Sequence, residues 1–226
     1  MALLTNVVLR RLFKLIFGVA LSVSVALLVV TFLRQKACGQ ACVVLIGDSI
    51  TANWQGLASG KKLAELRIVN RGVPGDVTAQ MLSRFNHDVI SPSPRVVVIQ
   101  GGINDFARVP LTSTEQNLEA MAEKAEGKGI AVVLATLLPT GQHDSDITAS
   151  AEDSGHKEIR ALNDWIKDFA ARKHFVLVDY HSVLADEQGF YQEGLTVDGI
   201  HPTAQGYARM EPVLRDAVQA AMRSGT

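Results

Sequence analysis

The chain of 226 residues is 47% hydrophobic and 20% charged, with a formal net charge of −1 at pH 7. This length suits one or two domains, and the apolar content is ample for a buried core. Residues 1–36 hold five of the 22 Lys and Arg and none of the 23 Asp and Glu, so the rest of the chain has a net charge of −6. An acidic domain without a basic stripe argues against a nucleic-acid partner.

The first expected element is a membrane span. Residues 15–33 are 19 consecutive residues without a charged side chain, preceded by Arg10, Arg11 and Lys14. At ~1.5 Å per residue a helix of this length measures roughly 28 Å, close to the ~30 Å hydrocarbon core of a bilayer. A core helix seldom lacks a polar face for so long. The sequence therefore predicts a basic flank and membrane anchor over residues 1–36 and a single folded domain over residues 37–226.

A signal peptide that is cleaved after secretion is the alternative for this run. Such a peptide should have an apolar core of ~7–15 residues and a small-x-small cleavage site soon afterwards. Here Arg34 and Lys36 follow the run, and the first acceptable site, Gly39-Gln40-Ala41, directly precedes the first strand. The uncleaved anchor is therefore favoured. Three basic residues before the run against two after it place the N-terminus in the cytoplasm and the domain on the periplasmic side.

The two cysteines, Cys38 and Cys42, lie between the run and the domain. Outside the cytoplasm they could close a small disulfide loop, and two ordinary thiols are the alternative. A C-x3-C pair without a second pair or a His cluster is a poor zinc signal.

Five short apolar runs predict strands in the domain. Val, Ile and Leu are continuous in them, which is typical of strands buried on both faces of a parallel sheet. The runs are residues 43–46, 66–70, 96–99, 130–134 and 175–178.

Amphipathic helices are expected between and after these strands. Thr112-x-x-Glu115 resembles a capping box and predicts the start of a helix that stops at Gly127 and Gly129. Residues 139–154, rich in Gly, Asp, Ser and Thr, are expected to form a surface loop. Apolar stripes at helical spacing indicate core-facing surfaces; they are Leu118, Met121, Ala122 and Ala125, then Ile159, Leu162, Ile166 and Phe169, then Tyr207, Met210, Leu214 and Val218. The alternation predicts an α/β fold, an open parallel sheet with helices on both faces.

Ligands of open parallel sheets bind beyond the carboxyl ends of the strands, so the residues that follow each strand are candidates for a site. Ser49 follows the first strand in Gly47-Asp48-Ser49-Ile50. The second strand leads into Asn70-Arg71-Gly72-Val73-Pro74-Gly75-Asp76, a turn whose N–H groups can point at a ligand. Asn104 follows the third strand in Gly101-Gly102-Ile103-Asn104-Asp105, where its amide can donate to a developing oxyanion. A helix cap, a plain turn and an Asx turn are the structural alternatives for these three motifs.

Asp198-Gly199-Ile200-His201-Pro202 lies in a polar loop after the fifth strand. A carboxylate three residues before an imidazole can hold one ring nitrogen and leave the other free for a serine.

These motifs together carry a family resemblance. G-D-S-I, N-x-G-x-x-G, G-x-N-D and D-x-x-H occur in this order, each after a predicted strand, and resemble the blocks of the GDSL (SGNH) hydrolase family over nearly all of residues 42–215. The resemblance implies a flavodoxin-like three-layer α/β/α domain with a five-stranded parallel sheet. It implies that Ser49 is the nucleophile, His201 the base and Asp198 its orienter. The N–H groups of Ser49 and Gly75 and the amide of Asn104 would be the oxyanion donors.

The reaction implied is ester hydrolysis through an acyl-enzyme, which needs no metal or cofactor. The domain has no room for a large lid, which favours short, acetyl-type esters on a small molecule or polymer. Trp54, Phe106 and Tyr191 are candidates to line the pocket, with ordinary packing as the alternative for each.

Other functions stay open. A lysophospholipase or acyl thioesterase would use the same site on longer chains, and an acetyltransferase would use the same triad while excluding water. A non-catalytic sugar-binding protein on this fold would normally have lost a triad member, and none is missing. The sequence gives no oligomeric state.

Overall fold

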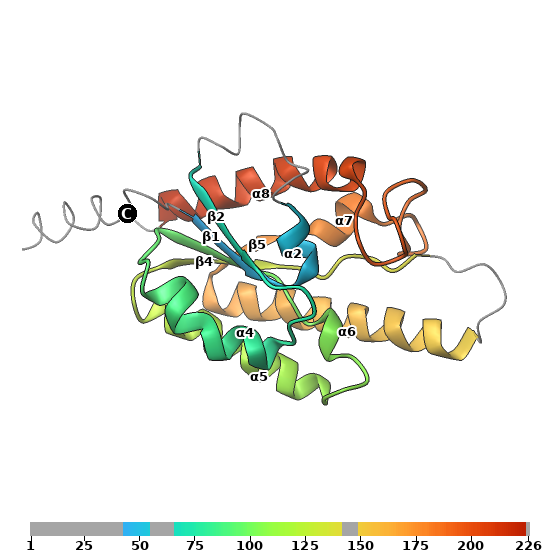
Figure 1. The fold of residues 1–226 in the computed structure, drawn as a ribbon, viewed down its shortest axis with the longest axis horizontal. Coiled ribbons are helices and arrows are strands. Elements are labelled where there is room, and N and C mark those ends of the chain that lie inside the picture. The colour runs from blue at the N-terminus through green and yellow to red at the C-terminus, as the bar shows by residue number, and fades with distance from the viewer. Residues whose placement is uncertain (1–42, 55–65, 142–148, 225–226) are drawn as a thin grey trace, which may run out of the picture. The chain divides into compact units, whose positions relative to one another are not determined.

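The computed structural model describes residues 43–54, 66–141 and 149–224, all within the compact unit Gln40–Thr226 (Figure 1). The expected anchor, Cys38 and Cys42 lie outside these residues. Within the described ranges no helix is both long and apolar enough to cross a membrane.

The centre of the domain is one sheet of five parallel strands in the order β2-β1-β3-β4-β5. This is the strand order of the flavodoxin-like doubly wound sheets, in which ligands bind where the order reverses, between β1 and β3. The prediction of an open parallel sheet is confirmed. The strands are β1 (Val43–Gly47), β2 (Ile68–Gly72), β3 (Val96–Ile99), β4 (Ala131–Ala135) and β5 (Val176–Val178).

The three central strands are buried on both faces because successive side chains point to opposite sides of the sheet. In β1, Val43 and Leu45 belong to one apolar core and Val44 and Ile46 to the other. β3 and β4 divide in the same way. This double burial is why the sequence shows continuous apolar runs instead of alternation.

Helices complete three layers around the sheet (Figure 1). One face is covered by α2 (Ser49–Asn53), α7 (Tyr180–Leu184) and α8 (Ala204–Ser224). The other is covered by α4 (Thr78–Phe85), α5 (Leu111–Glu126) and α6 (Ala149–Lys173). Two short turns complete the description, the π-helical η2 (Asn86–Ile90) and the 3₁₀-helical η3 (Ile103–Asp105).

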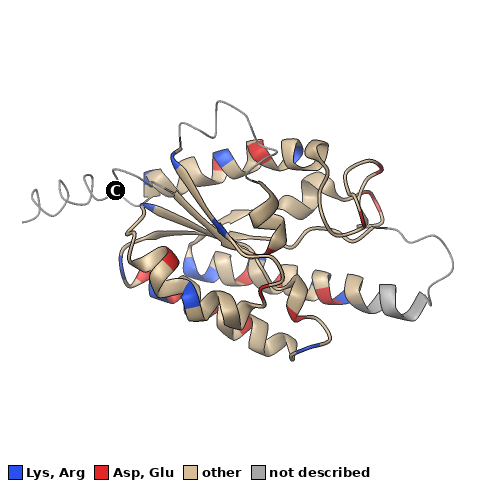
Figure 2. Ribbon diagram, in the orientation of Figure 1, with Lys and Arg blue, Asp and Glu red and all other residues tan. Residues whose placement is uncertain are grey.

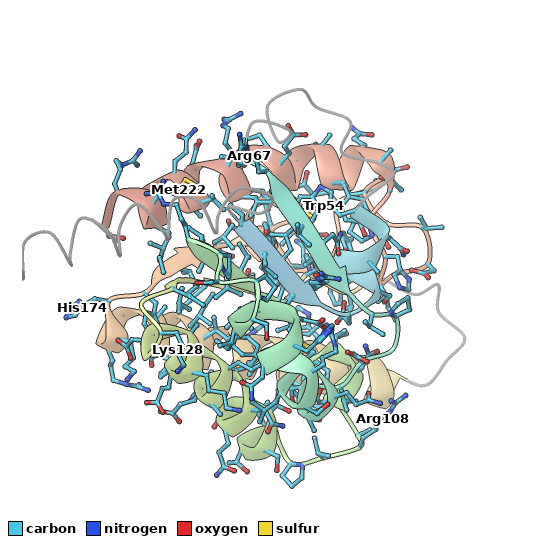
Figure 3. All side chains as sticks on the ribbon, turned by 60° about the vertical axis from the view of Figure 1, so that its left-hand side comes forward. Trp54, Arg67, Arg108, Lys128, His174 and Met222 are labelled. Carbon is cyan, nitrogen blue, oxygen red and sulfur yellow. The ribbon has the colours of Figure 1, made fainter. Side chains whose placement is uncertain are left out.

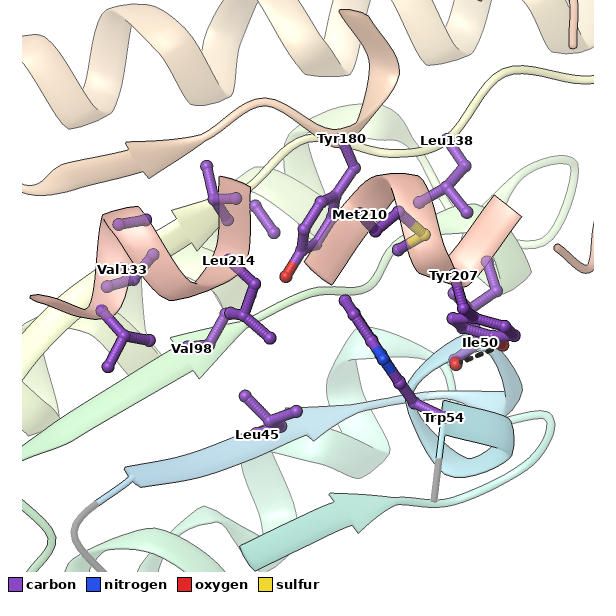
Figure 4. Close-up of a cluster of buried hydrophobic side chains, with 14 of the residues drawn as sticks. Leu45, Ile50, Trp54, Val98, Val133, Leu138, Tyr180, Tyr207, Met210 and Leu214 are labelled. Atoms are coloured by element: carbon purple, nitrogen blue, oxygen red, sulfur yellow. Dashed lines mark hydrogen bonds between the residues drawn. The ribbon is translucent and has the colours of Figure 1, made fainter. Parts of the chain in front are cut away.

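The apolar stripes predicted for α5, α6 and α8 are buried in these cores, as expected. Figure 4 shows the core beneath α8, where Trp54 lies beside Tyr180 and Tyr207. The Tyr207 hydroxyl donates to the backbone carbonyl of Ile50 at 2.7 Å, which ties α8 to α2.

Three predicted boundaries are wrong. Helix α5 begins at Leu111, with Pro110 as N-cap and no capping hydrogen bond from a side chain, because Thr112 already lies inside the first turn. β2 begins two residues later than predicted because Arg67 adopts a left-handed conformation, with φ +47°, that ends the preceding turn. The expected loop over residues 139–154 is shorter, because α6 begins at Ala149.

Because the strands are parallel, all of them begin along one side of the sheet and all of them finish along the opposite side. Lys128 and His174 lie at the edge where strands begin, and Arg108 lies at the opposite edge, beyond β3 (Figure 3). Charged side chains are carried by the helices and loops, and Arg71 is the one charged residue within the strands (Figure 2). The motifs after β1, β2 and β3 therefore meet at one edge.

Candidate active site

Ser49 lies at the junction between β1 and α2, half-buried at the first position of the helix. The preceding strand must end in glycine, because a Cβ on Gly47 would lie 2.1 Å from the Thr51 hydroxyl and 2.6 Å from the Gln100 carbonyl. Asp48 is the N-cap, and its Oδ1 accepts from the Ile50 N–H at 2.9 Å. This tight junction fixes where the serine hydroxyl points.

Asp48 is fully buried beside Ser49. Its second carboxylate oxygen has no hydrogen-bond partner among the described residues. Burial disfavours the charged form and raises the pKa of Asp48 to about 6, against the opposing effects of the Ile50 N–H and of His201 nearby. Keeping the carboxylate next to the serine ionised at neutral pH therefore costs stability.

Ser49, His201 and Asp198 form one chain of hydrogen bonds. The Ser49 hydroxyl lies 2.9 Å from His201 Nε2. His201 Nδ1 lies 2.7 Å from Asp198 Oδ2 on the other side of the ring. If Asp198 accepts from Nδ1–H, Nε2 is left to accept the serine proton. The structure brings together all three residues selected from the sequence.

Asp198 is well suited to stay ionised. Partial burial works against the charge, but hydrogen bonds from the backbone N–H and ring of His201 and from the Ile200 N–H outweigh it and hold the pKa of Asp198 at about 2. Oδ1 accepts the His201 N–H at 2.8 Å and the Ile200 N–H at 3.0 Å. The carboxylate therefore organises its own turn as well as the imidazole.

The loop that carries Asp198 and His201 is braced from outside. The Thr196 hydroxyl donates to the His201 carbonyl at 3.0 Å, and the Tyr191 hydroxyl to the Ile200 carbonyl, also at 3.0 Å. The Gly141 N–H donates to the Gly199 carbonyl at 2.8 Å. There the two backbones are in contact, since a Cβ on Gly141 would lie 2.6 Å from the Gly199 Cα.

The candidate oxyanion donors lie around the serine on three loops. Val73-Pro74-Gly75-Asp76 is a β-turn closed by a 3.2 Å bond from the Asp76 N–H to the Val73 carbonyl. Its third position requires a positive φ, and Gly75 has φ +81°. Among the described residues, no hydrogen bond uses the Gly75 N–H. The Asn104 amide donates to the Asp76 carbonyl at 3.0 Å, so one donor loop is bonded to the next.

Asp105, the residue after Asn104, joins these loops from beneath. It is fully buried and accepts from the Thr78 N–H at 2.9 Å, from the Thr78 hydroxyl, and from the Thr114 hydroxyl at 3.1 Å. Thr78 begins α4 directly after the Gly75 turn, and Thr114 lies in α5. One carboxylate thus fixes the η3 turn against two helices.

A small pocket lies among the neighbours of the candidate site residues. Ile50, Ile103 and Ile200 line it, and each is the sequence neighbour of a candidate site residue. Gln100, Leu137, Leu138, Pro139, Thr140 and Gly199 complete the wall, and the cavity between them is small, about 10 Å³. Its wall is mainly aliphatic, which suits a short hydrocarbon chain.

The three aromatic residues suggested for the pocket lie elsewhere. Trp54 is buried between Tyr180 and Tyr207, with ring centroids 5.7 and 5.3 Å away. Phe106 packs against the core on the other face of the sheet. Tyr191 is buried, and it reaches the site through the bond from its hydroxyl to the Ile200 carbonyl and the bond from its N–H to the Thr140 carbonyl. None of the three lines the pocket described above.

No group of three or more His, Cys, Asp or Glu side chains within the described residues could hold a metal ion.

Comparison with known proteins decides the family. A family model described as the GDSL-like lipase/acylhydrolase family matches residues 45–209, a span that contains every residue of the site. The chain belongs to this family. The GDSL-like protein is accordingly an enzyme, a hydrolase of the esterase and acylhydrolase class.

Two similar sequences and one solved structure agree with this assignment. Esterase TesA of Pseudomonas aeruginosa is 30% identical over 197 residues, covering 81% of this chain and 90% of TesA. A lipoprotein of Bacillus subtilis, YqeF, is 30% identical over 207 residues, covering 74% of this chain and 85% of its own. The structure of a GDSL-like lipase from Bacteroides thetaiotaomicron has a TM-score of 0.70 and 28% identity, covering 83% and 95% of the two chains.

Sequence reasoning missed the buried polar side chains that support the GDSL-like site. Asp48 and Asp105 belong to the recognised motifs, but neither received a role of its own. Arg84, which binds Asp76 at 2.7 Å, stands outside every motif. Its only sequence signal is the i,i+4 spacing to Asp88, which also fits an ordinary surface ion pair.

Proposed function

We propose that the protein is a serine esterase that cleaves short acyl esters through an acyl-enzyme on Ser49. The observation that carries the proposal is the continuous chain of bonds from the Ser49 hydroxyl through His201 to Asp198, at 2.9 and 2.7 Å. In this arrangement the ring takes the serine proton as the hydroxyl attacks the ester carbonyl. His201 then protonates the leaving alcohol, and a water molecule repeats the cycle on the acyl-enzyme.

The negative charge that develops on the carbonyl oxygen would be met by the Ser49 and Gly75 N–H groups and the Asn104 amide. The geometry supports this assignment because Asn104 uses one amide hydrogen on the Asp76 carbonyl and keeps its second for the oxyanion. Removing one such donor typically raises the barrier by ~2.7–4 kcal/mol.

The experiment that tests the nucleophile is Ser49→Ala in the full-length protein, assayed on nitrophenyl acetate. Hydrolysis should fall by several orders of magnitude, at an unchanged melting temperature. The exposed Ser224 at the end of α8 provides the control substitution Ser224→Ala. A folded Ser49→Ala protein with more than about a tenth of wild-type activity would refute the assignment.

The acyl preference follows from the small aliphatic pocket. Rates on nitrophenyl esters should be highest for acetyl to butyryl chains and fall for chains of about eight carbons or more. A well-buried methylene contributes ~0.8 kcal/mol, so a long acyl tunnel would give rates that rise steadily with chain length. That result would support a lysophospholipase or thioesterase instead. Acyl transfer to an added alcohol in preference to water would support a transferase.

We further propose that residues 15–33 form an uncleaved span that holds the domain outside the cytoplasm. The charge-free run, its flanking basic residues and the resemblance to a lipoprotein support an extracytoplasmic or membrane-associated protein. The full-length protein should fractionate with membranes, resist carbonate extraction and lose its domain to external protease. A mature protein in the periplasm or medium that begins near Cys42 would indicate a cleaved signal. Protection from external protease would reverse the topology.

A further inference from the structure

Arg84 makes an unusual set of contacts behind the site. Its guanidinium donates to Asp76 Oδ2 at 2.7 Å, to Asp88 Oδ2 at 2.6 Å, to the Arg71 carbonyl at 2.8 Å and to the Gly47 carbonyl at 3.0 Å. Its side chain is only 18% exposed. The residue lies in the last turn of α4, the helix that follows the Gly75 turn.

These four acceptors belong to the segments that carry the proposed oxyanion donors. Gly47 is two residues before Ser49, at the end of β1. Arg71 and Asp76 flank the Gly75 turn on either side. The Asp76 backbone carbonyl in turn accepts from the Asn104 amide at 3.0 Å. One side chain is therefore bonded to two donor loops directly and to the third through Asp76.

The guanidinium itself is held on the side away from the site. Asp88 lies in the π-helical turn η2, is buried, and bonds to both Arg84 and His87. Burial opposes its charge, but the hydrogen bonds from Arg84 and His87 outweigh burial and lower the pKa of Asp88. The carboxylates of Asp76 and Asp88, from two different segments, thus both bind the guanidinium and fix its plane. A lysine ammonium could replace the charge but not a planar set of four directed bonds.

We propose that Arg84 is a positioning residue that sets the spacing of the three oxyanion donors around Ser49. The inference rests on the esterase function proposed above. Arg84 does not touch the substrate in this arrangement; it acts through the Gly47, Arg71 and Asp76 acceptors. Donors displaced by a fraction of an ångström would still admit the ground-state ester but would bind the tetrahedral oxyanion less well. Loss of Arg84 should therefore lower kcat and leave KM nearly unchanged.

The test compares Arg84→Gln and Arg84→Lys with the control Arg215→Gln in the full-length protein. Arg215 lies in α8, and the bonds shown for it go only to the neighbouring Asp216. We expect Arg84→Gln to lower kcat on nitrophenyl acetate about 30- to 100-fold with a change in KM of less than about threefold. Arg84→Lys should restore little of the loss, and Arg215→Gln should match the wild type.

Two further readouts separate positioning from general stabilisation. The affinity for a trifluoromethyl ketone, which adds to the serine and leaves an oxyanion, should fall by the same factor as kcat/KM. In Arg84→Ala, added methylguanidine should restore part of kcat. If Arg84→Gln does not fold, the same measurements on Asp88→Asn decide the question, with an expected loss in kcat of about three- to tenfold.

Three results would overturn the inference: an unchanged kcat at a lowered melting temperature, a change confined to KM, or a ketone affinity that does not follow kcat/KM. These results are distinct from a failure of the proposed function, in which Ser49→Ala would keep its activity.

Discussion

Asp198 and His201 lie three residues apart in one loop, whereas Ser49, Gly75 and Asn104 come from the ends of three different strands. In this pair the Asp198 side chain is about half exposed, and its carboxylate is hydrogen-bonded within its own turn. The loops that carry the proposed oxyanion donors are bonded to Asp105 and Arg84, two mostly buried charged groups that bond across separate elements. The comparison teaches that a local motif can orient a base, whereas spacing several donors requires the whole fold.

The largest loss of activity is expected from removing the proposed base, His201. His201→Ala should lower kcat/KM about 10⁴-fold or more, because among the described residues the Ser49 hydroxyl is hydrogen-bonded to no other base. Asp198→Ala should cost less, since the Thr196 and Tyr191 bonds still hold the loop. Kinetics on nitrophenyl acetate check both variants, and melting temperatures serve as the control. A greater loss in Asp198→Ala than in His201→Ala would mean that the carboxylate does more than orient the ring.

On the donor side, Asn104→Ala should lower kcat about 10²- to 10³-fold while KM changes little. In the proposed mechanism the amide donates to the charge that develops only in the transition state, and its loss also frees the Asp76 carbonyl. Asn104→Asp, which keeps the size but cannot donate when ionised, should be at least as damaging. A loss that appears in KM alone would show that Asn104 binds the ground-state substrate instead.

The third prediction concerns the network beneath the donors. Asp105→Asn should lower the free energy of unfolding by about 3 kcal/mol, because an amide NH2 would face donor groups of Thr78 or Thr114. Urea unfolding measures the change. Thr114→Val, which removes one donor and leaves the carboxylate in place, should cost about 1 kcal/mol and serves as the matched variant. Equal losses in the two variants would contradict a central role for the carboxylate.

The smallest effect expected is a pH-dependent gain at Asp48. Its pKa is raised to about 6 in the folded protein from 3.8, so the folded state loses stability as pH rises through this interval and carries the full penalty above pH 6. Asp48→Asn keeps an oxygen for the Ile50 N–H and removes the charge. The free energy of unfolding should rise by about 1–2 kcal/mol at pH 8, because the buried NH2 offsets part of the roughly 3 kcal/mol that two pKa units represent. At pH 4 no gain is expected.

Asp88 provides a control in which the same substitution should change the free energy of unfolding in the opposite direction. Its pKa is lowered, so its ionised form stabilises the fold at neutral pH, and this contribution is lost as the pH falls through the lowered pKa. Asp88→Asn should therefore destabilise the protein at pH 8 and nearly as much at pH 4, because a carboxyl with a pKa below 3.8 is still largely ionised in the folded protein at pH 4. A gain from Asp48→Asn that is equal at pH 4 and pH 8 would show that burial of its charge is not the cause.

The sequence predicts the sheet better than its boundaries. Continuous apolar runs are produced by double burial in the central strands β1, β3 and β4, and shorter apolar runs mark the half-exposed edge strands β2 and β5. The start of β2 could not be read in this way, because the left-handed Arg67 depends on how the turn meets the sheet and carries no glycine to signal it. Pro110 and Thr112 are both acceptable at a helix start, and only the tertiary structure selects between them.

The site residues likewise fall into two groups, those that the sequence predicts and those that it does not. Ser49, Asn104 and His201 could be found because each stands in a short motif, the first two soon after a strand and His201 in the polar loop that follows β5 and α7. Arg84 could not, because its four bonds reach segments 4 to 37 residues away, and nothing within its own helix distinguishes it from a solvated charge. Trp54, a candidate to line the pocket, follows the serine motif in the sequence, but the turn of α2 directs its ring into the core under α8.

The contact between Gly141 and Gly199 restricts which residues can replace Gly141 in this enzyme. Gly141 does not itself line the pocket, yet any side chain there would push against Gly199, in the main chain beside His201. In a saturation library selected for activity, Gly141 should tolerate as few replacements as the histidine, although the inactive variants would still accumulate as folded protein. Engineering that reshapes the neighbouring loop for larger esters must therefore keep this pair and introduce its changes on the Leu137–Leu138 side of the pocket.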